Sequence, residues 1–456
     1  MKPIAPSFQP IPTTLRLALP TSDPAKLARQ LARTPPLVRR KPKYEVVEWT
    51  SPSPTHKPGP DATPSETPPN IAPDDTATGS LEPCFTTRVE RTTWPVRQRD
   101  GSLIDVVLNI GNISAGGQSA PVCELELVLM AGHPVALFEV AQKIAPTLAV
   151  LPTPLSLTER GAALSRGTLD APVKAKPTPL KNNVPVPVAA GHMLREMLGQ
   201  FTVNLQALRT SEDPEVVHQA RVGWRRFKSA QRLFRSTLPV ELQPSWEPLE
   251  PLLGFLGTLR DLDVALTETL PQWYDAYTAG DIRRQENWET VTQALRKTAH
   301  LQRKSVRYAL EAPEVGVALL AALRWIEGLL DTRATGEPSG NKPVTLRRWA
   351  RHRTDRLHKQ LQAATKDIGH MESQHRIRIM AKRLRYGTEA LQAVLPKRRA
   401  QRWIQKSTRL QTVLGFTRDT IRAAELVAEA NTDPRLVEFL RGVAAGDQLR
   451  LSSTPR

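Results

Sequence analysis

Two stretches of the chain show the clearest hydrophobic periodicity, and in both the polar face carries almost only basic side chains. At about 100° per residue, residues 218–235 (HQARVGWRRFKSAQRLFR) place alanine, glycine and phenylalanine on one side of a helix. Residues 375–391 (HRIRIMAKRLRYGTEAL) repeat this arrangement, with isoleucine and leucine behind the basic face. The two basic arcs consist of His218, Arg221, Arg225, Lys228, Arg232 and Arg235, and of His375, Arg378, Lys382 and Arg385. Each stretch therefore predicts a helix that buries one face and presents a ladder of positive charge on the other.

A second motif, LG-x2-RD, follows each basic stretch, at Leu256–Asp261 and Leu414–Asp419. The two leading histidines are 157 residues apart, and the two motif aspartates are 158 residues apart. Because both features recur at nearly one offset, an internal duplication is the economical explanation. We expect these motifs to be structural, with Arg260 and Asp261 forming a charge pair that orients the basic helix.

Breaker residues divide the C-terminal region into segments that are typical of helices. The expected helices are 191–209, 214–236, 244–270, 285–311, 313–332, 343–365, 374–395, 399–430 and 433–445. Asp213 suits the N-cap of the first basic helix, and Pro214 suits its first turn. The number of segments is about what two four-helix bundles need, with halves at about 191–332 and 343–450.

The N-terminal region has the short apolar runs and glycine-rich turns of antiparallel strands. We expect strands at 13–19, 85–97, 102–113 and 120–130, and a helix at 133–145. Residues 51–80 are rich in Pro, Ser, Thr and Asp, which predicts a disordered insertion, with an expanded loop as the alternative. The predicted fold class is α+β multidomain, with an antiparallel β domain over 1–167, a linker over 168–190 and an all-α domain over 191–450.

Composition points to a polyanionic partner. The 456 residues carry a net charge of +18, and the pI is about 10.2. Residues 1–189 contain 20 Lys and Arg against 16 Asp and Glu, so most of the excess charge lies in the helical region. Cys84 and Cys123 lack CxxC spacing, so no disulfide framework or zinc site is indicated. No run of about 18 apolar residues occurs. We therefore expect a cytoplasmic protein with no membrane segment and no cofactor.

The paired, histidine-led basic helices and the repeated LG-x2-RD motif together resemble the CHAD family, the conserved-histidine α-helical domains. The resemblance covers about residues 190–450 and includes an RD-x-D stretch that ends at Asp263. It implies two four-helix bundles that face each other and bind inorganic polyphosphate through their basic surfaces.

Rows of arginine and lysine suit such a ligand, because guanidinium groups donate hydrogen bonds to phosphate oxygens in a planar fork. The candidate binding residues are His218, Arg221, Arg225, Arg226, Lys228, Arg232, His375, Arg378, Lys382, Arg383 and Arg385, with a rim of Arg303, Lys304, Arg307, Arg348 and Arg351. A solvated helix face is the alternative interpretation. Glu389 interrupts the second arc, and we expect it to pair with Arg385. Each histidine is expected either to head a phosphate site or to lie neutral between helices.

Residues 10–170 resemble, in patches, the CYTH family of antiparallel β-tunnels that cleave triphosphates. The matching features are Arg88-x-Glu90 with Trp94, the strand of Asp105, Glu124-x-Glu126, the LFEVA helix and SLTERG at 156–161. The resemblance implies a β-barrel in which acidic strands hold divalent metal ions.

The departures from that family affect its catalytic strand. Pro12, Thr14 and Arg16 stand where the family has Glu-x-Glu-x-Lys, Asn109 replaces the usual aspartate, and Leu157 replaces the usual lysine. Metal-assisted phosphoryl chemistry needs several hard oxygen ligands. Glu124 and Glu126 would then be vestigial, and we expect a degenerate CYTH-like barrel that has lost metal binding and catalysis.

The sequence thus predicts a non-catalytic binder of inorganic polyphosphate, located by resemblance at polyphosphate granules, where granule proteins would be further partners. Three alternatives are compatible with it: a metal-dependent inorganic triphosphatase, a nucleic-acid-binding module, and a scaffold that tethers an enzyme to granules. The tryptophans of the helical region lie beside apolar positions, which indicates a core role and weighs against single-stranded nucleic acid. They are Trp224, Trp246, Trp325, Trp349 and Trp403.

Overall fold

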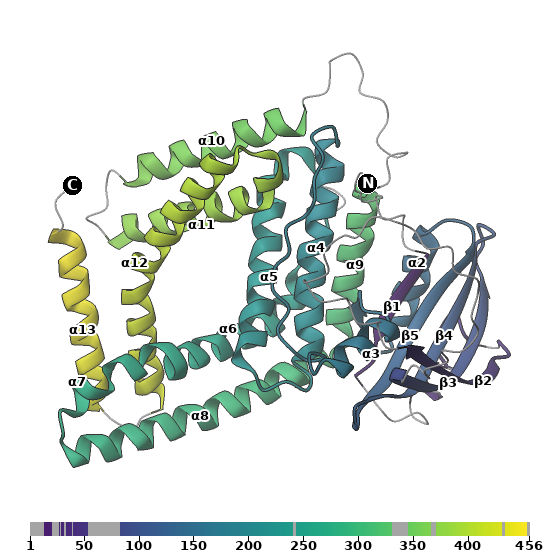
Figure 1. Ribbon diagram of the computed structural model, residues 1–456, viewed down its shortest axis with the longest axis horizontal. Coiled ribbons are helices and arrows are strands. Elements are labelled where there is room, and N and C mark those ends of the chain that lie inside the picture. The colour runs from purple at the N-terminus through teal and green to yellow at the C-terminus, as the bar shows by residue number, and fades with distance from the viewer. Residues whose placement is uncertain are drawn as a thin grey trace, which may run out of the picture.

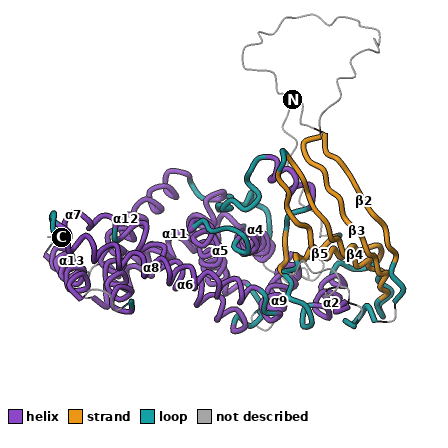
Figure 2. The backbone as a smooth tube through the Cα atoms, turned by 90° about the horizontal axis from the view of Figure 1, so that it is seen from below, coloured by secondary structure: helices purple, strands orange, loops and turns teal. Residues whose placement is uncertain are grey.

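An antiparallel sheet lies at one end of the molecule, and a helical region extends away from it (Figures 1 and 2). The computed structural model describes residues 13–20, 27, 29–31, 33–38, 40–52, 83–239, 243–330, 345–365, 371–430 and 434–453. The predicted combination of an N-terminal antiparallel sheet and a mostly helical C-terminal region is confirmed. The predicted insertion at 51–80 lies outside the described residues, except for Ser51 and Pro52, which belong to a strand.

Among the described residues the sheet has six strands in the order β2-β3-β4-β5-β1-β6, and each neighbouring pair is antiparallel. They are β1 (Thr14–Ala18), β2 (Lys43–Pro52), β3 (Pro83–Arg97), β4 (Leu103–Ala115), β5 (Gln118–Ala131) and β6 (Leu151–Thr153). Strands β1, β3, β4 and β5 correspond to those predicted, whereas β2 and β6 were not predicted. The expected closed barrel is wrong for the described strands, because the sheet is open with β2 and β6 at its edges.

Successive side chains along β4 and β5 point to opposite faces of the sheet, and helices cover both faces. Leu108 and Leu125 are paired on the face that α2 (Val135–Ile144) covers. Asn109 and Glu124 are paired on the opposite face, beneath α3 (Leu157–Ser165). Since both faces are covered, the polar side chains of the second face lie in the interior.

The helical region consists of two halves. The first half contains α4 (Val186–Ala207), α5 (Pro214–Leu233), α6 (Glu250–Val264), α7 (Tyr274–Thr278), α8 (Ile282–Leu310) and α9 (Pro313–Leu330). The second half contains α10 (Leu346–Ala364), α11 (Met371–Leu391), α12 (Lys397–Glu429) and α13 (Pro434–Ser453). Helix α4 begins inside the expected linker at 168–190. None of the described helices is long and apolar enough to cross a membrane.

The two halves meet where α5 packs against α11 and α6 packs against α12, so these helices outline a frame in Figure 1. Within the halves, α4 packs against α5 and α9, and α12 packs against α11 and α13. The core role expected for the tryptophans is confirmed. Trp325 and Trp403 are buried, and Trp224, Trp246 and Trp349 pack against the large core.

The sheet and the helical region share a hydrophobic core. Leu320 of α9 is completely buried in the cluster that fills the α2 face of the sheet. A Cβ atom built at Gly316 would lie 2.5 Å from the carbonyl oxygen of Val150, so α9 approaches the chain before β6 at backbone distance. Separating the two parts would therefore expose apolar surface on both.

Candidate functional site

The first basic ladder lies on α5 and points away from α4. Asp213 caps the helix by accepting a hydrogen bond from the backbone N–H of Glu215 at 2.8 Å, and Pro214 occupies the first turn, as predicted. A Cβ atom at Gly223 would lie 2.9 Å from the backbone nitrogen of Phe201 on α4. This close approach buries the face with Gly223 and Phe227, and the basic face is directed toward the second half.

Five cations from three helices converge where the halves meet. We call Arg221 and Arg225 of α5, Arg378 and Lys382 of α11, and Arg418 of α12 the central cluster. Burial, and then the positive charges of Arg378, Arg225 and Arg418 in that order, lower the pKa of Lys382 to about 8. Burial and neighbouring arginines, among them Arg418, also lower the pKa values of Arg221 and Arg378. The sequence-derived ladders on α5 and α11 are therefore brought together into one site.

Two guanidinium groups of the central cluster have a buried donor without an acceptor. The Nε atoms of Arg225 and Arg378 are hidden from solvent and have no hydrogen-bond partner among the described residues. No ion pair joins the five side chains of the cluster to a carboxylate in the described part of the chain. Buried donors without acceptors are costly. An anion that supplied oxygens to these N–H groups would remove that cost.

Acidic side chains lie at the margin of the cluster. Arg260 pairs with Glu268 at 2.6 Å, and Asp261 pairs with Arg422 of α12 at 3.2 Å. The predicted Arg260–Asp261 pair is therefore wrong, because each residue finds its partner on another turn or helix. Glu268 belongs to a π-helical turn, η3 (Ala265–Thr269), which continues α6 and packs against α12.

The second ladder contains the ion pair that the sequence predicted. The Nε atom of Arg385 lies 3.5 Å from the carboxylate of Glu389 one turn later, which confirms that prediction. The positive charge of Arg385 thereby partly compensates the negative charge that Glu389 adds to the basic face.

The two histidines do not occupy equivalent surroundings. His218 is half-buried at the head of the α5 ladder, and His375 is exposed on α11. Burial, followed by the charge of Arg260, lowers the pKa of His218. His218 is therefore neutral at pH 7 in the free protein, and neither imidazole is fully enclosed between helices.

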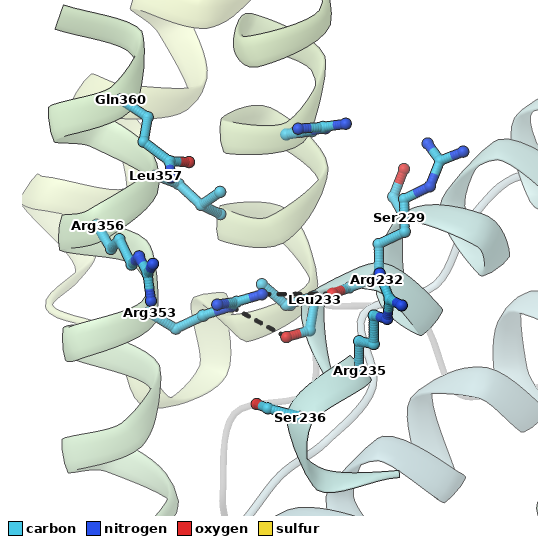
Figure 3. A pocket seen from close by; sticks show the side chains of 10 residues that line it. Ser229, Arg232, Leu233, Arg235, Ser236, Arg353, Arg356, Leu357 and Gln360 are labelled. Carbon is cyan, nitrogen blue, oxygen red and sulfur yellow. Dashed lines mark hydrogen bonds between the residues drawn. The ribbon is translucent and has the colours of Figure 1, made fainter. Parts of the chain in front are cut away.

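The C-terminal part of the α5 ladder leads to a cavity of about 630 Å³ between α5, α10 and α11 (Figure 3). Lys228 lies on the way to it, with its Nζ atom 4.9 Å from the ring centroid of Trp246. Burial, and then Arg232, lowers the pKa of Lys228 to about 8. We call this cavity the arginine pocket, since its lining includes Arg232, Arg235, Arg353, Arg356 and Arg383.

Three candidate residues are engaged elsewhere. Arg226 binds Glu196 at 3.0 Å and Gln200 at 2.6 Å on α4. Arg303 is only 6% exposed and contacts the carboxylates of Glu212 and Asp263 at 3.1 and 3.5 Å.

Arg307 also binds Glu212, at 2.6 Å, and donates to the carbonyl of Leu208. These partners remove Arg226, Arg303 and Arg307 from the candidate site. Lys304, Arg348 and Arg351 are exposed on α8 and α10, outside the central cluster.

Sequence reasoning missed Arg418, Arg353 and Arg356. Arg418 lies in the second LG-x2-RD motif, which was interpreted as structural. Arg353 and Arg356 lie on α10, where the more obvious row of cations faces another way. Their three-residue spacing, continued by Gln360, is the signal that could have identified this face of the helix.

The sheet holds the two glutamates expected to be vestigial metal ligands. Glu126 forms an ion pair with Arg16 at 3.0 Å, and the buried Glu124 lies 3.6 Å from the guanidinium of Arg160 on α3. Burial raises the pKa of Glu124 to about 7, against the opposing effect of Arg160. Within the described residues, no three His, Cys, Asp or Glu side chains form a group that could hold a metal ion.

A protein-family model described as "CHAD domain" matches residues 192–428, just over half of the chain. The chain is similar to the crystal structure of the CHAD domain from the plant Ricinus communis, with 27% sequence identity, a TM-score of 0.52, and coverage of 61% of this chain and 92% of that chain. It is also similar to PptA from Streptomyces chartreusis, with 18% identity, a TM-score of 0.39, and coverage of 59% and 95%. The family match extends from α4 to α12 and so includes every helix that carries the central cluster.

Proposed function

Because the chain belongs to the CHAD domain family, we propose that its helical region binds inorganic polyphosphate without cleaving it. The observation that carries this proposal is the convergence of five cations from α5, α11 and α12, none of which forms an ion pair among the described residues. Asp261 and Asp419 lie close enough to oppose, but not to reverse, the lowering of the pKa values of Arg221 and Arg378. A solvated helix face would place its charges apart in water. In the central cluster four of the side chains are instead half-buried, with the exposed Arg418 beside them. Burial and the neighbouring positive charges lower the pKa values of Arg221, Arg378 and Lys382, which favours an anionic ligand.

The chemistry of the ladders fits a chain of phosphates. Recognition of such a chain rests on charge neutralisation and on hydrogen bonds to its non-bridging oxygens, which arginine donates in pairs and lysine as a mobile point charge. Cations on α5 recur every three or four residues, or about 4.5–6 Å along the helix axis. An extended polyanion can contact several of them at once, and release of its condensed counterions adds affinity that depends on salt.

We propose in addition that the protein has no catalytic activity, because of the surroundings of the two candidate metal ligands of the sheet, Glu124 and Glu126. Arg16 and Arg160 approach the two carboxylates that a divalent cation would need, so a positive charge already occupies each position. Incubation with tripolyphosphate and Mg²⁺ or Mn²⁺ is expected to release no phosphate. Metal-dependent release would overturn this part of the proposal.

The proposal also covers the domain architecture of the chain and the place in the cell where the protein acts. The open sheet would be a degenerate CYTH-like domain, and the halves of the helical region would be two four-helix bundles that face each other. The protein would act in the cytoplasm at polyphosphate granules, with granule proteins as further partners.

The direct test is titration of the full chain with long-chain polyphosphate over a series of salt concentrations, with duplex DNA as competitor. The full chain is needed because the helical region shares a core with the sheet through Leu320. We expect tight binding that weakens steeply with salt, and displacement by DNA only at a large excess. Equal preference for DNA, or no binding, would remove polyphosphate as the ligand.

Binding is expected to weaken as the pH rises above about 8, because Lys382 must be protonated to hold the polyanion. In the free protein burial, Arg378 and Arg385 on its own helix, Arg225 on α5 and Arg418 on α12 hold the pKa of Lys382 at about 8. A bound polyanion raises this pKa. Binding then takes up a proton above pH 8, and the affinity falls by up to about tenfold per pH unit for each such lysine. The measurement is the dissociation constant between pH 7 and 9.5.

The matched control is the double variant Lys228→Arg and Lys382→Arg. Arginine keeps its charge throughout this range, so the variant should bind at pH 7 and lose most of the pH dependence. A slope as steep as that of the wild type would show that other groups take up the proton.

A further inference from the structure

The arginine pocket gathers five guanidinium groups around a half-open cavity. It lies between the C-terminal end of α5 with the following turn η1 (Arg235–Thr237), α10 and α11, and its volume of about 630 Å³ is within the range of small-molecule sites, roughly 300–1,000 Å³. Besides its five arginines it is lined by Ser229, Ser236, Gln360, Leu233 and Leu357. No carboxylate lines it within the described residues. The pocket is therefore a cationic chamber with additional neutral hydrogen-bonding groups.

One arginine of the pocket, Arg353, forms hydrogen bonds with the end of α5 and so has a structural role. Arg353 donates hydrogen bonds to the carbonyls of Leu233 at 3.1 Å and Arg232 at 3.4 Å (Figure 3). These carbonyls belong to the last turn of α5, where the helix dipole is negative. Arg353 thus screens these carbonyl oxygens, which would otherwise repel an anion in the pocket.

The other four arginines have no ion-pair partner in the described part of the chain. Arg232, Arg235, Arg356 and Arg383 are exposed, and they come from α5, η1, α10 and α11. Several separate elements therefore direct free guanidinium groups to one chamber. On the ladder, by contrast, successive cations follow one another along a single helix.

We propose that the arginine pocket binds the dianionic terminal phosphate of a linear polyphosphate. An internal phosphate of such a chain carries about one negative charge, whereas a terminal phosphate carries up to about two at neutral pH. The group with the higher charge fits the pocket, which is lined by five arginines and no carboxylate among the described residues. The terminal phosphate can belong to a long chain or to a short linear oligophosphate, and both present the same chemistry.

The ladder gives the proposed binding a direction. Arg221 and Arg232 are separated by about 16 Å along α5. Acids adjoin the central cluster at its margin, where Glu268 pairs with Arg260 and Asp261 pairs with Arg422. Asp419 belongs to the same acidic margin and lies near Arg378 and Arg418. A chain with its end in the arginine pocket would run along Lys228 to the central cluster and turn away before these carboxylates. For long chains this inference rests on the proposed function.

The test compares linear tripolyphosphate with cyclic tetrametaphosphate, which has no terminal phosphate but a similar total charge of about four at neutral pH. We expect the wild-type full chain to bind the linear compound at least about tenfold more tightly. The variant Arg235→Gln with Arg356→Gln should lose this preference. It leaves the structural Arg353 and the central cluster intact.

The matched control is Arg283→Gln with Arg347→Gln, which removes two exposed arginines of α8 and α10 that do not line the pocket. It should retain the preference for the linear compound. Equal binding of the linear and cyclic compounds by the wild type would overturn the inference. So would a preference that survives in the Arg235→Gln/Arg356→Gln variant.

Competition separates the two sources of the terminal phosphate. If long chains place their ends in the pocket, they displace tripolyphosphate at equal concentration of chain ends; if they do not, the pocket serves short oligophosphates. Failure of long chains to bind, with the linear preference retained, contradicts only the proposed function. Loss of the linear preference, with long-chain binding retained, contradicts only the pocket.

Discussion

Reversing the charge of the central cluster is expected to abolish the binding of long-chain polyphosphate. The variant replaces Arg221, Arg225, Arg378 and Lys382 with glutamate. These side chains converge from α5 and α11, so the substitutions replace four attractive contacts by repulsion. The affinity should fall by at least about 1,000-fold, and a milder glutamine variant should lower the slope of log K against log salt by about 3, or roughly 0.7 per lost contact. Titration of the full chain at several salt concentrations measures both quantities.

The fold should survive these substitutions. The four side chains are half-buried, and burial, followed by the charges of Arg378 and Arg225, lowers the pKa of Lys382, so their positive charges destabilise the free protein. Circular dichroism and thermal unfolding of the glutamine variant check this point. A glutamine variant that is folded and binds as tightly as the wild type would remove the central cluster from the site.

The control variant carries the same change in net charge elsewhere. It replaces Arg283, Arg296, Lys297 and Arg347 with glutamate, all exposed on α8 and α10. If binding depends on the central cluster, the control keeps its affinity within about tenfold at moderate salt. An equal loss in both variants would mean that the total charge of the protein, and not this site, attracts the ligand.

The basic ladders could be predicted because helical periodicity alone determines which side chains share a face. Arg221 and Arg225 follow one another by one turn on α5, as do Arg378 and Lys382 on α11, and no tertiary information is needed to place each pair together. From the internal duplication we could also infer that the basic faces of α5 and α11 are equivalent. The duplication could not show that they meet, because that depends on how α5 packs against α11.

Partners on other helices could not be predicted from periodicity. Arg225 and Arg226 are adjacent in the sequence, yet Arg225 faces the central cluster and Arg226 pairs with Glu196 on α4. The same limit explains Arg353, whose role follows from the position of α10 beside the end of α5. Arg260 and Asp261 were expected to pair because they are adjacent in the sequence. In the structure Arg260 pairs with Glu268, and Asp261 pairs with Arg422.

The sheet shows a different limit. Strand β2 (KYEVVEWTSP) lies at an edge, and Tyr44 and Val46 are exposed there, so it lacks the clear alternation of a half-buried strand. The closed barrel was inferred from resemblance and not from hydrophobic pattern. Pattern can predict the face that a strand buries, but the closure of a sheet depends on which strands form its edges.

Replacing Arg160 with methionine is expected to destabilise the sheet strongly. Glu124 is 1% exposed, its carboxylate accepts no hydrogen bond from the described residues, and Arg160 is the cation beside it at 3.6 Å. Removing one partner of a buried ion pair typically costs about 3–5 kcal/mol. Urea unfolding and hydrogen exchange of the β4 and β5 amides would measure the loss.

The loss should grow with pH. Burial raises the pKa of Glu124 in the folded protein to about 7, above its value of about 4.3 in an unfolded chain. Its contribution to stability is therefore fully present below about pH 4.3 and is lost as the pH rises through 7. Without Arg160 the folded pKa rises further, so the loss continues above pH 7. The difference in unfolding free energy between wild type and Arg160→Met should thus be larger at pH 8.5 than at pH 5.

The double variant Glu124→Leu with Arg160→Met separates the buried charge from the packing of the side chains. It also loses the hydrogen bond from Arg160 to the carbonyl of Pro121. Because apolar residues can replace a buried ion pair at little net cost, it should recover most of the stability and lose the pH dependence. If instead Arg160→Met is as stable as the wild type at pH 8.5, the carboxylate of Glu124 reaches water or another donor, and Arg160 does not hold it in the interior of the sheet.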